Sequence, residues 1–136
     1  MRGTASRRAR RTARSRACRW GGGLTINSGF SHPDLFSALG IFSPGIPRDF
    51  ETKFKTALGD AKGINSKIGL IWIACGDQDT TVQYPRVQKF AALLDEHGIH
   101  PTLRTIEGGA HTWPVWRLSL AEFAPMLFKP VSRNRG

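Results

Sequence analysis

The segment IGLIWIAC, residues 68–75, decides the fold, because it is a continuous apolar run bounded by polar residues. Such a run, without alternation of apolar and polar positions, is typical of a parallel strand covered on both faces. The tetrapeptide GDQD, residues 76–79, follows at once as a polar turn. We therefore predict a buried central strand whose carboxyl end carries two aspartates.

Outward from that strand, helical and extended patterns alternate along the chain. An apolar segment at 38–43 and a short segment at 102–106, after Pro101, predict two further strands. Apolar residues on one face predict helices over residues 49–58, 82–97 and 115–128, and a helix over 21–30 is predicted between its opening glycines and the Ser31-His32-Pro33 that closes it. This alternation predicts an α/β fold, with a parallel sheet of about three strands and helices on both faces. One long edge of so small a sheet is expected to lack its neighbouring strand.

Two loops at predicted strand ends carry residue types that a hydrolase needs. Loops after the carboxyl ends of parallel strands are where function gathers. Asp79 follows the strand at 68–75, and His111 lies in a glycine-containing loop after the strand at 102–106. An Asp can hold the tautomer of a His that takes a proton from a nucleophile and returns it to a leaving group. Other interpretations stay open: Asp79 can cap a helix, Asp77 can shape the turn, and His111 can be a solvated surface residue.

Four longer stretches of the sequence resemble a known family. They are GGGLTINSGFSHPDLFSALGIFSPG (21–45), IWIACGDQDT (71–80), EGGAHTWPVW (107–116) and FAPMLF (123–128). In this order they resemble the C-terminal half of the esterase family that includes feruloyl esterases and esterase D, in the α/β-hydrolase superfamily. The resemblance implies a Ser–Asp–His triad in which Asp79 is the acid and His111 is the base. It also implies that Trp113 and Trp116 flank the base, although core packing is the simpler interpretation of Trp116.

The nucleophile of that family is missing. The family's turn reads Gly-Leu-Ser-Met-Gly-Gly just before a helix, whereas residues 17–22 read Ala-Cys-Arg-Trp-Gly-Gly, so Arg19 takes the serine position. Arginine stays protonated and is no nucleophile. Cys18 lies one position early, and a strained strand-to-helix turn presents one side chain only. With allowed codons, a one-base shift over residues 11–20 yields His-Arg-Ala-(Ile or Val)-Ala-Gly-Leu-Ser-Met-Gly, so we hypothesise that residues 1–20 are an out-of-frame translation.

The charge of the chain is concentrated at its start. The net charge is +10, and residues 1–22 carry eight arginines and no acidic residue, while the remainder is nearly balanced. We expect a disordered arginine-rich leader over 1–20, a partial α/β-hydrolase domain over 21–130 and a tail over 131–136. A nucleic-acid arm and a mitochondrial-type presequence are the rival interpretations of the leader. Because aromatic residues are not interleaved with the arginines before Trp20, we expect no specific nucleic-acid partner.

Composition excludes a few other classes of site. No apolar run reaches about 18 residues, so no membrane partner or span is predicted. The basic start lacks the apolar run of a secretory signal, and the sequence predicts no particular compartment. Cys75 lies in the buried run and is interpreted as a structural thiol, and Cys18 and Cys75 form no pair with metal-ligand spacing.

Together these features predict a carboxylic ester hydrolase by resemblance, a serine esterase of the feruloyl- or acetyl-ester type. We expect little or no activity from this chain, because the serine and the N-terminal half of the fold are missing. The expected substrate of the parent enzyme is a small-molecule or polysaccharide-linked ester, and no metal or organic cofactor is implied. The alternative is a non-catalytic α/β module with a basic nucleic-acid-binding arm.

Overall fold

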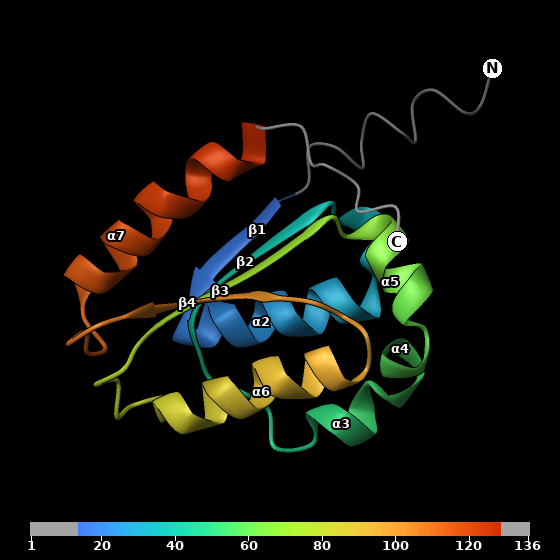
Figure 1. The fold of residues 1–136 in the computed structure, drawn as a ribbon, viewed down its shortest axis with the longest axis horizontal. Helices are drawn as coiled ribbons and strands as arrows, with labels where there is room; N and C mark the ends of the chain where they lie inside the picture. The colour runs from blue at the N-terminus through green and yellow to red at the C-terminus, as the bar shows by residue number, and fades with distance from the viewer. Residues whose placement is uncertain (1–13, 129–136) are drawn as a thin grey trace.

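The computed structural model describes residues 14–128 and shows a parallel sheet between two layers of helices (Figure 1). The sheet has four strands in the order β1-β2-β3-β4, and every neighbouring pair is parallel. Their bounds are Arg14–Cys18 (β1), Ala38–Pro44 (β2), Leu70–Gly76 (β3) and Thr102–Ile106 (β4). The α/β fold class predicted from the sequence is confirmed, and the sheet contains one strand more than the apolar pattern predicted.

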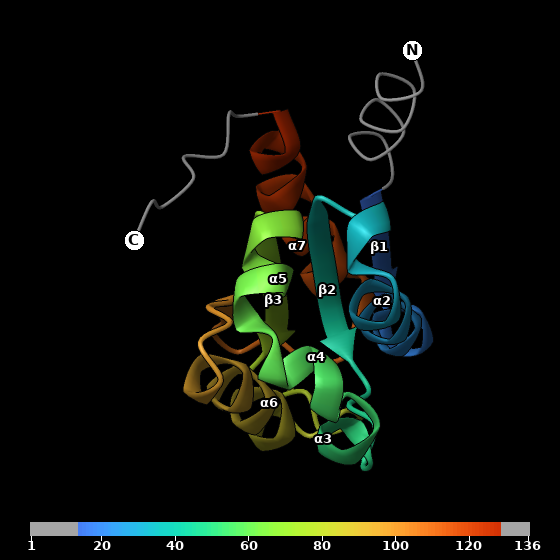
Figure 2. The same cartoon turned by 90° about the vertical axis from the view of Figure 1, so that its right-hand side faces the viewer.

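The helices divide unequally between the two faces of the sheet. They are α2 (Arg19–Ser31), α3 (Phe50–Lys53), α4 (Lys55–Gly59), α5 (Ala61–Lys67), α6 (Tyr84–Glu96) and α7 (Trp113–Phe123), with 3₁₀ turns η1 (Pro33–Leu35) and η2 (Ala124–Phe128). Helices α2 to α6 cover one face, and α7 covers the other (Figures 1 and 2). Within residues 14–128, no helix is both long and apolar enough to cross a membrane.

The predicted helix over 49–58 is interrupted, and an unpredicted helix follows it. The first part is α3 and the second is α4, which ends at Gly59. Asp60 then caps α5, because its side chain accepts a hydrogen bond of 3.1 Å from the Gly63 backbone N–H. A side chain that satisfies a free N–H at a helix start favours a new helix over continuation of the old one.

Alternation along β3 explains why its sequence is apolar throughout. Ile71 and Ile73 face the larger core cluster beneath α2 and α6. Trp72 faces the other side, where its ring stacks on Phe123 of α7 and meets the edge of Phe42 of β2, with centroids 5.5 and 5.8 Å apart. Successive strand residues point to opposite faces, so a strand buried on both sides has no position for a polar residue.

The start of the described chain corrects the prediction of disorder over residues 1–20. Residues 14–18 form β1, which pairs with β2 from Arg14 opposite Ala38 to Ala17 opposite Ile41, and α2 begins directly after it. Strand pairing uses backbone groups, so the edge of the buried strand β2 can take a partner whose side chains are charged. The first part of the predicted leader, 1–13, and the predicted tail, 131–136, lie outside the described residues.

Candidate active site

All four strands end at one edge of the sheet, because they run parallel. The loop after β3 holds Asp79, and the loop after β4 holds His111. β2 ends at the same edge with Ser43 and Pro44, and the backbone of β1 passes into α2 there. The structure therefore brings together the Asp and the His that the sequence predicted, although 32 positions separate them.

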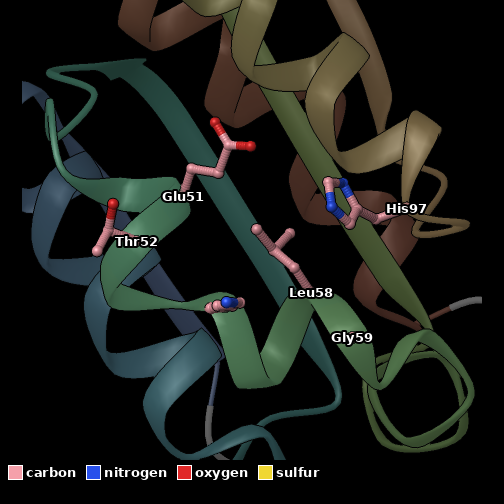
Figure 3. Close-up of a pocket in the computed structure, with 6 residues that line it drawn as sticks. Glu51, Thr52, Leu58, Gly59 and His97 are labelled. Atoms are coloured by element: carbon pink, nitrogen blue, oxygen red, sulfur yellow. The ribbon is translucent and has the colours of Figure 1, made fainter.

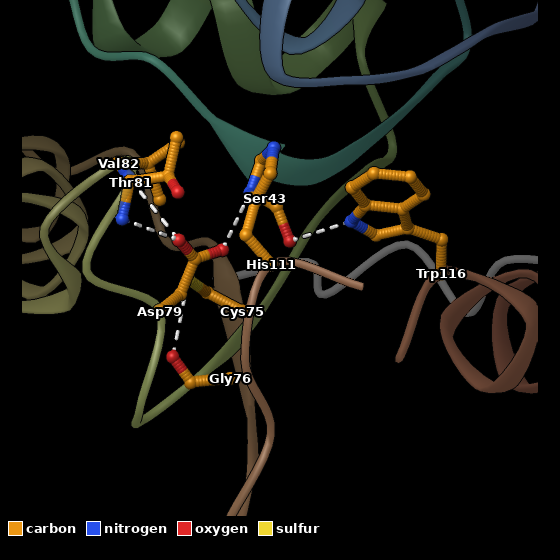
Figure 4. A network of polar contacts seen from close by, with 8 residues as sticks. All are labelled: Ser43, Cys75, Gly76, Asp79, Thr81, Val82, His111 and Trp116. Atoms are coloured by element: carbon orange, nitrogen blue, oxygen red, sulfur yellow. Dashed lines mark hydrogen bonds and ion pairs between the residues drawn. The ribbon is translucent and has the colours of Figure 1, made fainter. Parts of the chain in front are cut away.

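Asp79 is buried and uses both carboxylate oxygens (Figure 4). Only 1% of the residue is exposed. Oδ1 accepts hydrogen bonds from the backbone N–H groups of Thr81 and Val82, at 3.1 Å each. Oδ2 lies 2.8 Å from Nδ1 of His111. The alternative that Asp79 caps a helix is wrong, because Gln83 is the N-cap of α6 and no side chain caps that helix; Asp79 instead holds the turn before α6 and contacts the histidine.

The contact with Asp79 assigns different roles to the two nitrogens of His111. A carboxylate oxygen only accepts hydrogen bonds, so Nδ1 is the nitrogen that donates. Nε2 is then the ring atom left to accept a proton from another group. The side chain is 17% exposed, so it is neither a fully solvated surface histidine nor a sealed core residue. This is the geometry that acid–base chemistry by an Asp–His pair requires.

Close backbone packing holds the two loops against each other. A Cβ atom on Gly76 would overlap the carbonyl group of Gly109, so the loops can approach this closely only with glycine at 76. The Gln78 N–H donates to the Gly109 carbonyl at 2.8 Å. The Gly108 N–H donates to Oδ1 of Asp77, also at 2.8 Å. Asp77 thus does more than shape its own turn, because it joins the aspartate loop to the histidine loop.

The two tryptophans after His111 form a chain of ring contacts that begins at the histidine. The Trp116 ring meets the His111 ring at 81°, with centroids 4.9 Å apart. Trp113 meets Trp116 at 88° and 6.2 Å, and 66% of Trp113 is exposed. Trp116 therefore contacts the imidazole directly and is half-buried rather than part of the core, whereas Trp113 contacts Trp116.

Sequence reasoning missed Ser43. This residue is the penultimate residue of β2, is 1% exposed, and has φ of 43°. Its Oγ accepts a hydrogen bond of 3.2 Å from Nε1 of Trp116 (Figure 4). The only local signal was a polar residue at the end of an apolar strand, before Pro44, and that pattern is also typical of an ordinary turn.

Cys75 lies near Asp79 and Ser43, and its thiol is unreactive. It is fully buried at the end of β3, and its Sγ donates to the Gly76 carbonyl at 3.5 Å. Burial, and then the nearby Asp79 carboxylate, raise the pKa of the Cys75 thiol to about 12. A thiol with such a pKa stays protonated near neutral pH, which agrees with its interpretation as a structural thiol.

The remaining features of the described chain do not extend this site. A groove of about 510 Å³ lies on the surface (Figure 3), and it is lined by Glu51, Thr52, Lys55, Leu58, Gly59 and His97. His97 follows the end of α6, while Asp79 precedes its start, so a helix of 13 residues, roughly 20 Å long, separates the groove from the Asp–His pair. Over residues 14–128, no group of three or more His, Cys, Asp or Glu side chains could hold a metal ion.

Comparison with known proteins identifies the type of fold. No family model matches the chain. A solved ferulic acid esterase superposes with a TM-score of 0.62 at 20% identity, over 81% of this chain and 49% of its own. S-formylglutathione hydrolase from Staphylococcus aureus gives 0.71 at 17% identity, over 89% of this chain and 53% of its own. Acyl-protein thioesterase 2 from Zea mays gives 0.61 at 16% identity, over 82% and 54%.

The chain spans about half the length of each of these structures. At such identities the superpositions establish the fold alone. The superpositions therefore show that the chain has a partial α/β-hydrolase fold.

Proposed function

We propose that this chain carries the Asp–His half of the catalytic machinery of a carboxylic ester hydrolase. One observation carries the proposal: the buried Asp79 carboxylate lies 2.8 Å from Nδ1 of His111, at the carboxyl edge of the sheet. In this proposal Asp79 orients the ring, and Nε2 of His111 takes the proton of a nucleophile and returns it to the leaving alcohol. The partial fold of esterase type supports the same assignment.

The nucleophile is the part that this chain lacks. The backbone passes from β1 to α2 between Cys18 and Arg19, which is where the family resemblance places the nucleophile turn. Arg19 stands at the serine position of that turn, and a guanidinium stays protonated. We therefore propose that the chain by itself has little or no esterase activity.

Other groups near His111 do not replace the serine. Among the described residues Ser43 makes no hydrogen bond to His111, and its buried Oγ accepts from Trp116 instead. Cys75 is fully buried and its raised pKa keeps the thiol neutral. A nucleophile needs both contact with the base and access for an acyl group, and each of these residues fails on at least one count.

The proposed substrate class is a carboxylic ester of a small acyl group. The resemblance favours feruloyl or acetyl esters, including those linked to polysaccharide. The matched structures are named a ferulic acid esterase, an S-formylglutathione hydrolase and an acyl-protein thioesterase, and these names share the hydrolysis of an acyl group from its carrier. The proposed chemistry requires no metal or organic cofactor.

The test uses two proteins. The first is the 136-residue chain, assayed with 4-nitrophenyl acetate beside its His111→Ala variant, and we expect equal and near-background rates. The second is the reading frame obtained by sequencing the DNA from upstream of codon 1 through codon 25 and joining any upstream esterase frame that ends in Gly-Leu-Ser-Met-Gly. There we expect hydrolysis that falls by about six orders of magnitude in His111→Ala and by about four in Asp79→Asn.

Each protein can overturn a different part of the proposal. If the chain alone hydrolyses the ester and loses that activity in His111→Ala, its inactivity is refuted. If the joined enzyme is active but His111→Ala leaves its rate unchanged, the assignment of the base is wrong. If no upstream esterase frame exists, the alternative of a basic binding module is tested by a DNA mobility shift before and after removal of residues 1–13, a deletion that leaves β1 intact.

A further inference from the structure

A single hydrogen bond does not hold an imidazole in one orientation. The bond between Asp79 Oδ2 and His111 Nδ1 fixes one ring atom, yet the ring can still turn about that contact. Rotation about the second side-chain torsion of histidine is broad, because it joins sp³ and sp² atoms. The direction of Nε2 therefore depends on what touches the rest of the ring.

Trp116 supplies the second contact. Its ring meets the imidazole nearly at right angles, at 81°, with centroids 4.9 Å apart. An edge-to-face contact at this distance is favourable and depends on orientation, so it resists turning of the His111 ring. Trp116 lies on α7, one helical turn after the loop of His111, and the Trp116 backbone N–H donates to the Thr112 carbonyl at 3.3 Å.

Ser43 in turn fixes Trp116. The indole Nε1–H donates to Oγ of Ser43 at 3.2 Å, and this oxygen belongs to a residue that is 1% exposed. Ser43 has φ of 43°, in the left-handed region that favours glycine, and it precedes Pro44, which ordinarily restricts the preceding residue to extended conformations. A non-glycine residue kept in so unfavourable a conformation suggests a role for its side chain.

The same segment also contacts the first turn of α2. A Cβ atom on Gly22 would come within 2.8 Å of Cα of Pro44, so only glycine allows α2 to approach this closely. The Ser43–Pro44 segment therefore lies between the start of α2 on one side and the Trp116–His111 pair on the other. A change at Ser43 can reach the histidine without contacting it.

We propose that Ser43 and Trp116 are positioning residues that fix the rotation of the His111 imidazole. Ser43 holds the indole of Trp116 by its buried hydroxyl, and Trp116 holds the ring of His111, so that Nε2 keeps one direction relative to the β1–α2 turn. This inference rests on the proposed function of His111 as a base, but the order of the ring is measurable without any catalysis.

The experiment is NMR of the full chain labelled with ¹⁵N, with the His111 ring signals assigned by their loss in His111→Gln. Two variants remove the hydroxyl: Ser43→Ala keeps the strained backbone, and Ser43→Gly relieves it and so is expected to fold. In both we expect the Trp116 Nε1–H signal to move and the His111 ring signals to broaden. In Trp116→Phe, which keeps an aromatic ring but has no N–H to donate, the Nε1–H signal is lost and we expect the His111 ring signals to broaden less than in the Ser43 variants.

Trp113→Phe is the matched control, because Trp113 contacts Trp116 but no ring contact joins it to His111 among the described residues. We expect its His111 signals to match those of the unmodified chain. If Ser43→Gly leaves both the Trp116 Nε1–H and the His111 signals unchanged, the proposal is wrong. It is equally wrong if Trp113→Phe broadens the His111 signals as much as Ser43→Gly does.

A kinetic measurement separates this proposal from the proposed function. In an enzyme with the serine restored, we expect Ser43→Gly to lower kcat by about 10- to 100-fold with KM nearly unchanged, because a base that points wrongly affects the chemical step. If His111→Ala leaves hydrolysis intact while the NMR coupling holds, the function fails and the positioning stands. If His111→Ala abolishes hydrolysis and Ser43→Gly does not alter kcat, the positioning fails and the function stands.

Discussion

Replacement of Asp79 by Asn tests whether the buried carboxylate organises the site. The carboxylate accepts three hydrogen bonds, from Thr81 N–H, Val82 N–H and His111 Nδ1–H. In Asp79→Asn the remaining oxygen can keep the two backbone bonds, but they lose their charge assistance, which costs about 1 kcal/mol each. The new amide NH₂ then faces His111 and donates, which forces the ring into the other tautomer.

The loss of charge assistance sets the size of the expected effect. We expect the free energy of unfolding of Asp79→Asn to fall by about 2 kcal/mol. Urea unfolding followed by tryptophan fluorescence measures this, and a drop of that size lowers the midpoint by about 1 M for a small domain. Asp77→Asn is the matched control, because Asp77 is half-buried and accepts one bond, from Gly108 N–H, that the Asn oxygen can retain.

Two results would refute this reasoning. A midpoint of Asp79→Asn equal to that of the unmodified chain would mean that the charge of the carboxylate contributes nothing to the loop. Equal shifts in Asp79→Asn and Asp77→Asn would mean that the two charge-assisted backbone bonds of Asp79 contribute no more than the single bond of Asp77.

Further predictions concern Gly76 and Cys75. Gly76→Ala should lower the urea midpoint strongly or prevent folding, because the new Cβ overlaps Gly109, whereas Gly59→Ala, with no atom within 4 Å of its Cβ, should be neutral or stabilising; similar midpoints for both variants would contradict this. In a Cys18→Ser background, iodoacetamide should alkylate Cys75 only after urea unfolds the chain, as measured by mass spectrometry; rapid alkylation without urea would contradict the burial. Because the pKa of Cys75 rises from 9.0 to about 12 on folding, the unfolded thiol ionises first, and stability should fall as pH rises across that interval; Cys75→Ala should lack this component of the fall.

The sequence alone predicted the layered core and the two loops. The apolar run that contains Ile71 and Ile73 predicted a strand covered on both faces, because it has no polar residue along its length. Asp79 and His111 were found because each follows a predicted strand in an α/β pattern, where parallel strands carry their loops to one edge. A local pattern indicates which segment is buried and in which direction it runs, because both depend on residues that are close together in the sequence.

The first strand shows where such patterns fail. Its sequence, RSRAC over Arg14–Cys18, is charged and predicts disorder, yet it pairs with β2. The free energy that selects this strand comes from backbone groups on a neighbouring edge, which lies more than twenty residues further along the chain. The composition of residues 14–18 therefore does not indicate that they pair with β2.

The contacts around His111 were decided only by the tertiary structure. Which oxygen of Asp79 reaches the ring, and that Ser43 holds Trp116, depend on sheet register and on how α7 packs against β2, with 73 positions between the serine and the tryptophan. The sequence determined which residue types stand at the ends of strands, because the local pattern of apolar residues indicates which segments are buried. The fold decided which of them touch, because contacts between distant segments exist only after the strands have paired and the helices have packed.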